Sequence, residues 1–178
     1  MSLLGSVIAT KQSRDQHIMR WSRDCRAKFM PSTLGLAMTK NMKHKKITKK
    51  TDHIIRIQKG EDVIIEVTKF CKENNIKSGA FTGIGACEKA ELGSYSVKTK
   101  QYSKKTFEGE HEITSLTGII SNTKIHAHAN ISDEDFHVFG GHVDLMIVSA
   151  TCEIHLIAGE EAVSRKLDEE TGLELMDI

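Results

Sequence analysis

One helix-like segment followed by a long series of strand-like segments is the feature that most limits how this chain folds. A short β-rich segment at 53–57 comes first, and apolar residues then recur with helical spacing at Val63, Ile64, Val67, Phe70 and Cys71. Strand-like segments follow at 79–86, 90–97, 112–121, 124–131 and 142–157, the last as one long bent strand or as two. Strands joined by hairpin-length gaps favour antiparallel pairing. The order predicts an α+β fold, with a mostly antiparallel β-sheet flanked by one main α-helix.

Charge is divided unevenly along the chain. Residues 1–50 hold 12 of the 25 Lys and Arg residues and only two acids, which gives this part a net charge of +10. The remaining 128 residues hold 13 basic and 22 acidic residues, a net charge of −9. Such a division is typical of a basic tail attached to an acidic body. We therefore expect a basic extension over 1–50 and a folded domain over 51–178.

The basic extension has three open interpretations. It is a disordered, solvated segment, a stretch upstream of a true start at Met38 or Met42, or an organelle presequence, because it contains Arg and few acids. In the first case, its basic run at 40–50 would give weak, non-specific affinity for the phosphates of DNA.

The apolar runs and the cysteines of the chain bear on membrane contact and on cellular location. No apolar run approaches the roughly 20 residues that cross a bilayer, so we expect no membrane partner. The four cysteines form no C-x-x-C pair, and buried, reduced thiols fit a cytoplasmic protein. A nuclear or organellar location is the alternative if residues 1–50 act as a targeting or basic tail.

Three histidines within a short window form a candidate metal site. His126 and His128 are two residues apart, so on a strand both imidazoles would project from one face. His142 follows the pair Gly140-Gly141, which permits a tight return and a close approach of the backbone. Three neutral imidazoles around one point bind a first-row metal and leave coordination positions open. The alternative interpretation is a set of partly exposed strand histidines with no shared partner.

Carboxylates near these histidines have possible supporting roles. Asp144 shares a strand face with His142 and is a candidate to orient its imidazole. If the metal activates water, Asp135 and Glu112 are candidates for the general base. The alternative for Asp135 is a solvated turn within the polar loop at 133–135.

Five short motifs occur in an order that resembles the plants-and-prokaryotes-conserved domain, abbreviated PPC or PCC. They are Arg56-x-x-x-Gly60-Glu61-Asp62, Thr82-Gly83-Ile84-Gly85-Ala86, Glu112-Ile113-x-Ser115-Leu116-x-Gly118, His126-x-His128 and Gly140-Gly141-His142. The resemblance extends over about 52–178, and it is greater to the stand-alone prokaryotic members than to the plant members.

The resemblance implies a homotrimer with a metal cluster at His126, His128 and His142, for which zinc is the expected divalent ion. It also implies a DNA-associated regulatory module. In plant members an AT-hook ahead of the domain binds DNA, and this chain has no AT-hook and an acidic body. We therefore expect any DNA contact to be weak and to use the basic tail.

Two alternatives to a binding module remain. The first is a metal-dependent enzyme that acts on an unknown small molecule through the same three histidines, and we consider it less well supported than the binding module. The second is a cupin-like barrel, which also combines H-x-H with a later histidine. It ranks lower because it predicts a proline-glycine turn before the last histidine, and no proline stands there.

Overall fold

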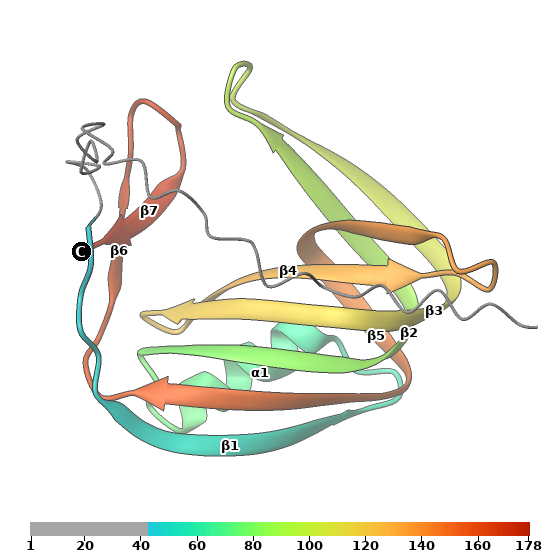
Figure 1. Cartoon of the computed structure of the whole chain (residues 1–178), viewed down its shortest axis with the longest axis horizontal. Helices are drawn as coiled ribbons and strands as arrows, with labels where there is room; N and C mark the ends of the chain where they lie inside the picture. The colour runs from blue at the N-terminus through green and yellow to red at the C-terminus, as the bar shows by residue number, and fades with distance from the viewer. Residues whose placement is uncertain (1–42) are drawn as a thin grey trace, which may run out of the picture. The chain divides into compact units, whose positions relative to one another are not determined.

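The structure is a computed structural model that describes residues 43–178 of the chain. The main sheet contains β1 (Lys49–Gln58), β2 (Ser78–Ser96), β3 (Gln101–Ser121), β4 (Lys124–Ser132) and β5 (Val138–Gly159). The helix α1 (Val63–Glu73) connects β1 to β2, and a separate two-stranded hairpin contains β6 (Ser164–Leu167) and β7 (Glu174–Asp177) (Figure 1).

All strand pairs of the main sheet are antiparallel, in the order β1-β5-β2-β3-β4. The long strand β5 also pairs with β4, through residues 138–142, while its later residues pair with β1. The sheet therefore curls so that both of its edge strands lie against β5. The mostly antiparallel sheet predicted from the sequence is confirmed, with three changes: segments 79–86 and 90–97 form one continuous strand, β3 begins at Gln101 instead of 112, and β5 is a single strand that begins at Val138.

The helix α1 is short, and its limits follow from local chemistry. The carboxylate of Asp62 accepts hydrogen bonds from the backbone N–H groups of Ile64 and Ile65, at 2.8 and 3.0 Å, and so caps the first turn. The buried side chains Val63, Val67 and Cys71 form its inner face. With eleven residues, this helix flanks the sheet but is too short to cross a membrane, and no other helix in the part described here would cross one.

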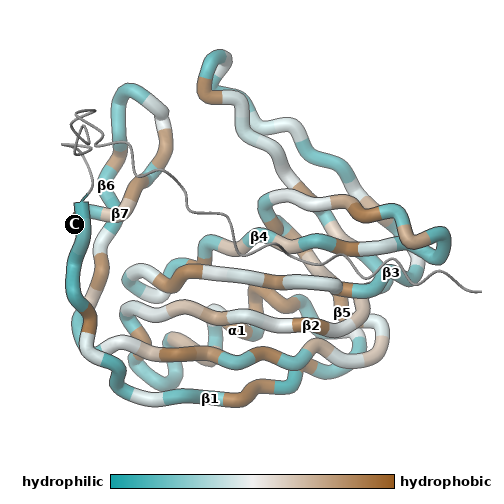
Figure 2. Tube along the Cα trace, in the orientation of Figure 1, coloured by the Kyte–Doolittle hydropathy of each residue, from teal (hydrophilic) through white to brown (hydrophobic). Residues whose placement is uncertain are grey.

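The two faces of the sheet differ in what covers them. The inner face carries the apolar core, including Phe81, Leu116 and Leu156, against which α1 packs. Hydrophilic and hydrophobic residues alternate along the strands (Figure 2), as expected for a sheet with one buried face. The outer face nevertheless leaves several aliphatic side chains exposed: Ile54, Ile84, Ile119 and Ile157.

Candidate metal centre

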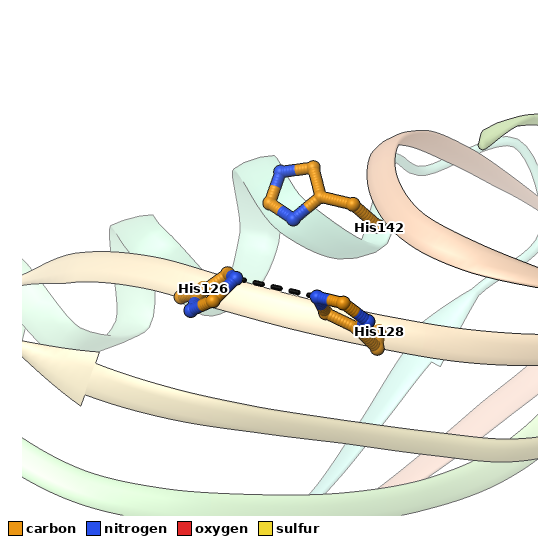
Figure 3. A group of neighbouring side chains, drawn as sticks. All are labelled: His126, His128 and His142. Atoms are coloured by element: carbon orange, nitrogen blue, oxygen red, sulfur yellow. Dashed lines mark hydrogen bonds between the residues drawn. The ribbon is translucent and has the colours of Figure 1, made fainter. Parts of the chain in front are cut away.

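The structure brings the three sequence-predicted histidines together on the outer face of the sheet. His126 and His128 lie on β4, and His142 on β5 is the direct cross-strand partner of His128. The Nε2 atoms of His126 and His128 are 3.3 Å apart. One ring nitrogen from each of the three residues lies within 4.8 Å of the others (Figure 3). Such spacing allows three imidazoles to share one metal ion.

Local sequence explains why these side chains meet. Along β4 the exposed His126 and His128 alternate with the buried Ala127 and Ala129, so both imidazoles project from the outer face. At Gly141 an added Cβ would lie 2.7 Å from the carbonyl oxygen of Gly93 on β2. A side chain at position 141 would therefore push β5 away from β2, as expected from the Gly-Gly pair before His142.

His142 carries a buried nitrogen that has no hydrogen-bond partner. This atom is Nδ1, and Figure 3 shows a nitrogen of the His142 ring turned toward the other two imidazoles. The ring centroid of His142 is 5.2 Å from that of His126 and 5.5 Å from that of His128. Leaving a polar atom buried and unpaired is unfavourable, and a metal ion at this point would pair it. The donor set therefore fits a metal with nitrogen ligands.

The surroundings favour neutral imidazoles, which are the form that binds metal. Partial burial lowers the pKa of His126 below its ordinary value of 6.5, and the neighbouring charges of His142 and Arg165 lower it further. Partial burial also lowers the pKa of His142, against an opposing effect of Asp144. Both rings are therefore neutral at pH 7 and available to a metal.

These lowered pKa values predict how the metal-free protein responds to acid. The unfolded chain takes up protons on these two histidines near pH 6.5, whereas the folded chain takes them up only at lower pH. Stability is therefore lost as the pH falls through 6.5 toward the folded-state pKa values. We expect the urea midpoint of the metal-free wild type to fall more steeply between about pH 7 and pH 5.5 than that of His126→Ala/His142→Ala. Parallel pH profiles would contradict this expectation.

The carboxylates proposed as helpers are not brought into the group. Within residues 43–178 the cluster consists of the three histidines, without Glu112 or Asp135. Within residues 43–178 no hydrogen bond joins Asp144 to His142, although the charge of Asp144 acts on the His142 ring, and its Oδ1 atom lies 3.3 Å from the Nζ atom of Lys104. The loop at 133–137 is held internally, since Asp133 accepts hydrogen bonds from the backbone N–H groups of Asp135 and His137. The solvated-turn interpretation fits this loop.

Two neighbours of the cluster were not indicated by the sequence. The ring of Tyr102, on β3, lies 6.0 Å from that of His142. Arg165, on β6, is close enough to His126 to lower its pKa and donates from Nε to the Ser121 hydroxyl at 2.5 Å. Neither residue belongs to a local motif with the histidines, so only the tertiary arrangement reveals them.

The sequence also matches a family model, the Plants and Prokaryotes Conserved (PCC) domain, over residues 44–160. The chain belongs to the PCC domain family. This confirms the family inferred from the five motifs, and the matched region contains the three histidines. None of the curated proteins compared with the chain matches it.

Several solved structures share the fold. A metal-containing protein from Archaeoglobus fulgidus is 31% identical, with a TM-score of 0.71 over 76% of this chain and 99% of that one. A protein from Bacteroides thetaiotaomicron described as a "putative dna binding protein" is also 31% identical, with a TM-score of 0.68 over 74% of this chain and 96% of that one. A plant- and prokaryote-conserved protein from Pyrococcus horikoshii is 27% identical, with a TM-score of 0.71 over 77% and 98% of the two chains.

Proposed function

We propose that this PCC domain is a metal-binding module whose ion is held by His126, His128 and His142. The observation that carries the proposal is the convergence of three ring nitrogens within 4.8 Å, one of them buried and unpaired. A related protein described as metal-containing supports it. Imidazole donors suit zinc, and three protein ligands leave a fourth position open. Zinc is therefore the ion that we expect.

Elemental analysis of the purified chain tests this assignment. We expect about one zinc per chain in the wild type and in His155→Ala, which removes an exposed histidine outside the cluster. The double variant His126→Ala/His128→Ala should contain almost none, because one imidazole alone does not hold the ion. Absence of metal from the wild type, even after reconstitution with zinc, would refute the proposal.

We further propose that the domain works as a homotrimer assembled through the outer face of the sheet. Cross-strand pairs place Ile157, Ala80 and Ile119 in one row that leads to His126. Ile54 and Ile84 add exposed aliphatic surface, at 81% and 61% of their full accessible area. An exposed apolar patch of this kind marks an interaction surface. The proposed interface adjoins the metal site, so assembly would shield one side of it.

DNA association is the regulatory part of the proposal. The related Bacteroides protein supports it through its description, and so does the basic run at 40–50. Most of the basic extension, residues 1–42, lies outside the described residues. Phosphate contacts by these lysines would give weak binding that falls with salt. A cytoplasmic location belongs to the same proposal.

A metal-dependent enzyme remains the second candidate. His126 and His128 are exposed, so a small molecule can approach the open coordination position from solvent. There the ion would act as a Lewis acid or activate water when bound. Turnover that is abolished by His142→Ala, in a protein of unchanged assembly state, would favour this candidate over a pure binding module.

A further inference from the structure

The strands β2 and β3 extend beyond the rest of the sheet as a two-stranded arm. The last pair between β2 and β5 joins Gly93 to His142, and β2 and β3 then continue alone to the turn at 97–100 (Figure 1). We define the β2–β3 arm as residues 94–105, with Lys104 and Lys105 at its base opposite Gly93 and Leu92 of the sheet. It contains four lysines and no acid, although residues 51–178 together have a net charge of −9. The arm is thus a basic projection from an acidic domain.

One face of the arm is held against the molecule. Tyr95 and Tyr102 pair across the two strands with ring centroids 4.8 Å apart. The hydroxyl of Tyr95 donates to the carbonyl oxygen of Thr171 at 2.8 Å, and the Nζ atom of Lys100 donates to that of Glu169 at 2.7 Å. A free two-stranded hairpin is only marginally stable. These contacts with the loop between β6 and β7 support the arm from its tyrosine side.

The opposite face of the arm is polar and exposed. Because side chains alternate along each strand, this face carries Ser94, Ser96, Gln101, Ser103 and Lys105, all of which are exposed. Serine, glutamine and lysine are side chains that donate hydrogen bonds to the phosphates of nucleic acids. No apolar side chain interrupts this face, which argues against burial in a protein core.

Three of the four arm lysines form no salt bridge within the described residues. Lys104 pairs with Glu91 and Asp144, at 3.0 and 3.3 Å. For Lys98, Lys100 and Lys105, no carboxylate of residues 43–178 lies within 4.0 Å. The Nζ atom of Lys105 instead lies 4.8 Å from the ring centroid of Phe107, which positions its side chain.

The basic surface of the arm continues toward the start of the described chain. Hydrogen bonds from Thr171 lower the pKa of Asp168, and the charges of Lys100 and Lys43 lower it further. Lys43 and Lys100 therefore lie near the same carboxylate. A polyanion that contacts Lys43 can reach the turn of the arm as well.

We propose that the polar face and turn of the β2–β3 arm bind duplex DNA, with the lysines on phosphates and the ribbon in the major groove. The inference rests on the proposed DNA association but assigns a contact to the folded domain instead of the extension alone. A major groove about 12 Å wide admits a two-stranded ribbon, and β-ribbon proteins bind DNA in this way. Charge complementarity identifies the partner, because the arm is basic and DNA is a polyanion.

Fluorescence anisotropy with a labelled, mixed-sequence duplex tests the arm in the full chain. We expect Lys98→Glu/Lys100→Glu to weaken binding at least about tenfold near 100 mM salt. The slope of log affinity against log salt should also decrease in magnitude by about 2, one for each lost phosphate contact. Because Lys100 also donates to the carbonyl oxygen of Glu169, the single variant Lys98→Glu, at an exposed turn position, should keep the melting temperature of the wild type and still reduce the slope by about 1.

The matched control is Lys59→Glu/Lys72→Glu, which changes the net charge equally at two exposed positions, one before α1 and one in its last turn. We expect its affinity to stay within about threefold of the wild type. Equal losses of DNA affinity in the arm variant and in this control would overturn the arm assignment. If Lys45→Glu/Lys46→Glu abolishes binding and the arm variant does not, DNA association stands and the arm inference fails. A wild type that does not bind the duplex at about 50 mM salt would refute both the proposed DNA association and the arm inference.

Discussion

Zinc is expected to raise the melting temperature of the wild-type chain, and His142→Ala is expected to abolish this increase. Free zinc at 100 times its dissociation constant stabilises a folded protein by about 2.7 kcal/mol. For a chain of this size, that corresponds to an increase of roughly 5–10 °C. His142 supplies the buried nitrogen that faces the other two imidazoles. Its loss should weaken zinc binding by at least about a hundredfold, more than changes to groups around the ligands usually do.

Two comparisons separate a lost ligand from a damaged fold. Without metal, His142→Ala should be as stable as the wild type to within about 1 kcal/mol, because the removed nitrogen makes no hydrogen bond. His155→Ala, which lies on the same strand outside the cluster, should keep the full zinc-dependent increase. Differential scanning calorimetry measures the zinc-dependent increase in melting temperature. An equal increase in His142→Ala and the wild type would contradict a role for His142 as a ligand.

Gly118→Ala is expected to destabilise the domain by about 1–3 kcal/mol through overpacking. Gly118 on β3 is the direct partner of Phe81 on β2, and an added Cβ would overlap the phenyl ring. Phe81 is only 1% exposed and is among the largest fully buried side chains of the core. The ring therefore has little space to move away. Urea unfolding curves of the metal-free protein, all recorded at one protein concentration, measure the change in the free energy of unfolding.

A double-mutant cycle identifies the cause of that loss. In the presence of Phe81→Leu, which removes the flat ring, Gly118→Ala should cost at least about 1 kcal/mol less than in the wild type. Thr117→Ala, at the neighbouring exposed position on β3, should change stability by no more than about 0.5 kcal/mol. Additive effects of the two core substitutions would show that the ring does not fill the space above Gly118.

Much of the secondary structure could be predicted because its signals are local. The helical spacing from Val63 to Cys71 indicated α1, and Asp62 caps that helix. The histidine pair on β4 could also be predicted, since alternation along a strand depends only on residues two apart. The strands β6 and β7 were missed, because each has only four residues and no strong apolar alternation.

The residues that lie beside the three histidines could not be predicted, because they are brought there by the pairing of strands that are distant in the sequence. Asp144 was a candidate to orient His142 by strand position, and the structure adds Lys104 from β3 as a salt-bridge partner of its carboxylate. Tyr102 approaches His142 only because β3 turns back along β2. The sequence shows lysines at 98–105, but it does not show that Lys98 and Lys100 extend beyond the sheet in an arm.

The sequence by itself determined the family, the helix, the main strands and the three candidate ligands, because each depends on residue type and short spacing. Only the tertiary structure decided that His142 lies opposite His128, that the outer face remains uncovered and that the arm projects. Strand register is set by the pairing of distant segments and by the packing of one face of the sheet. Short-range periodicity contains no information about that pairing.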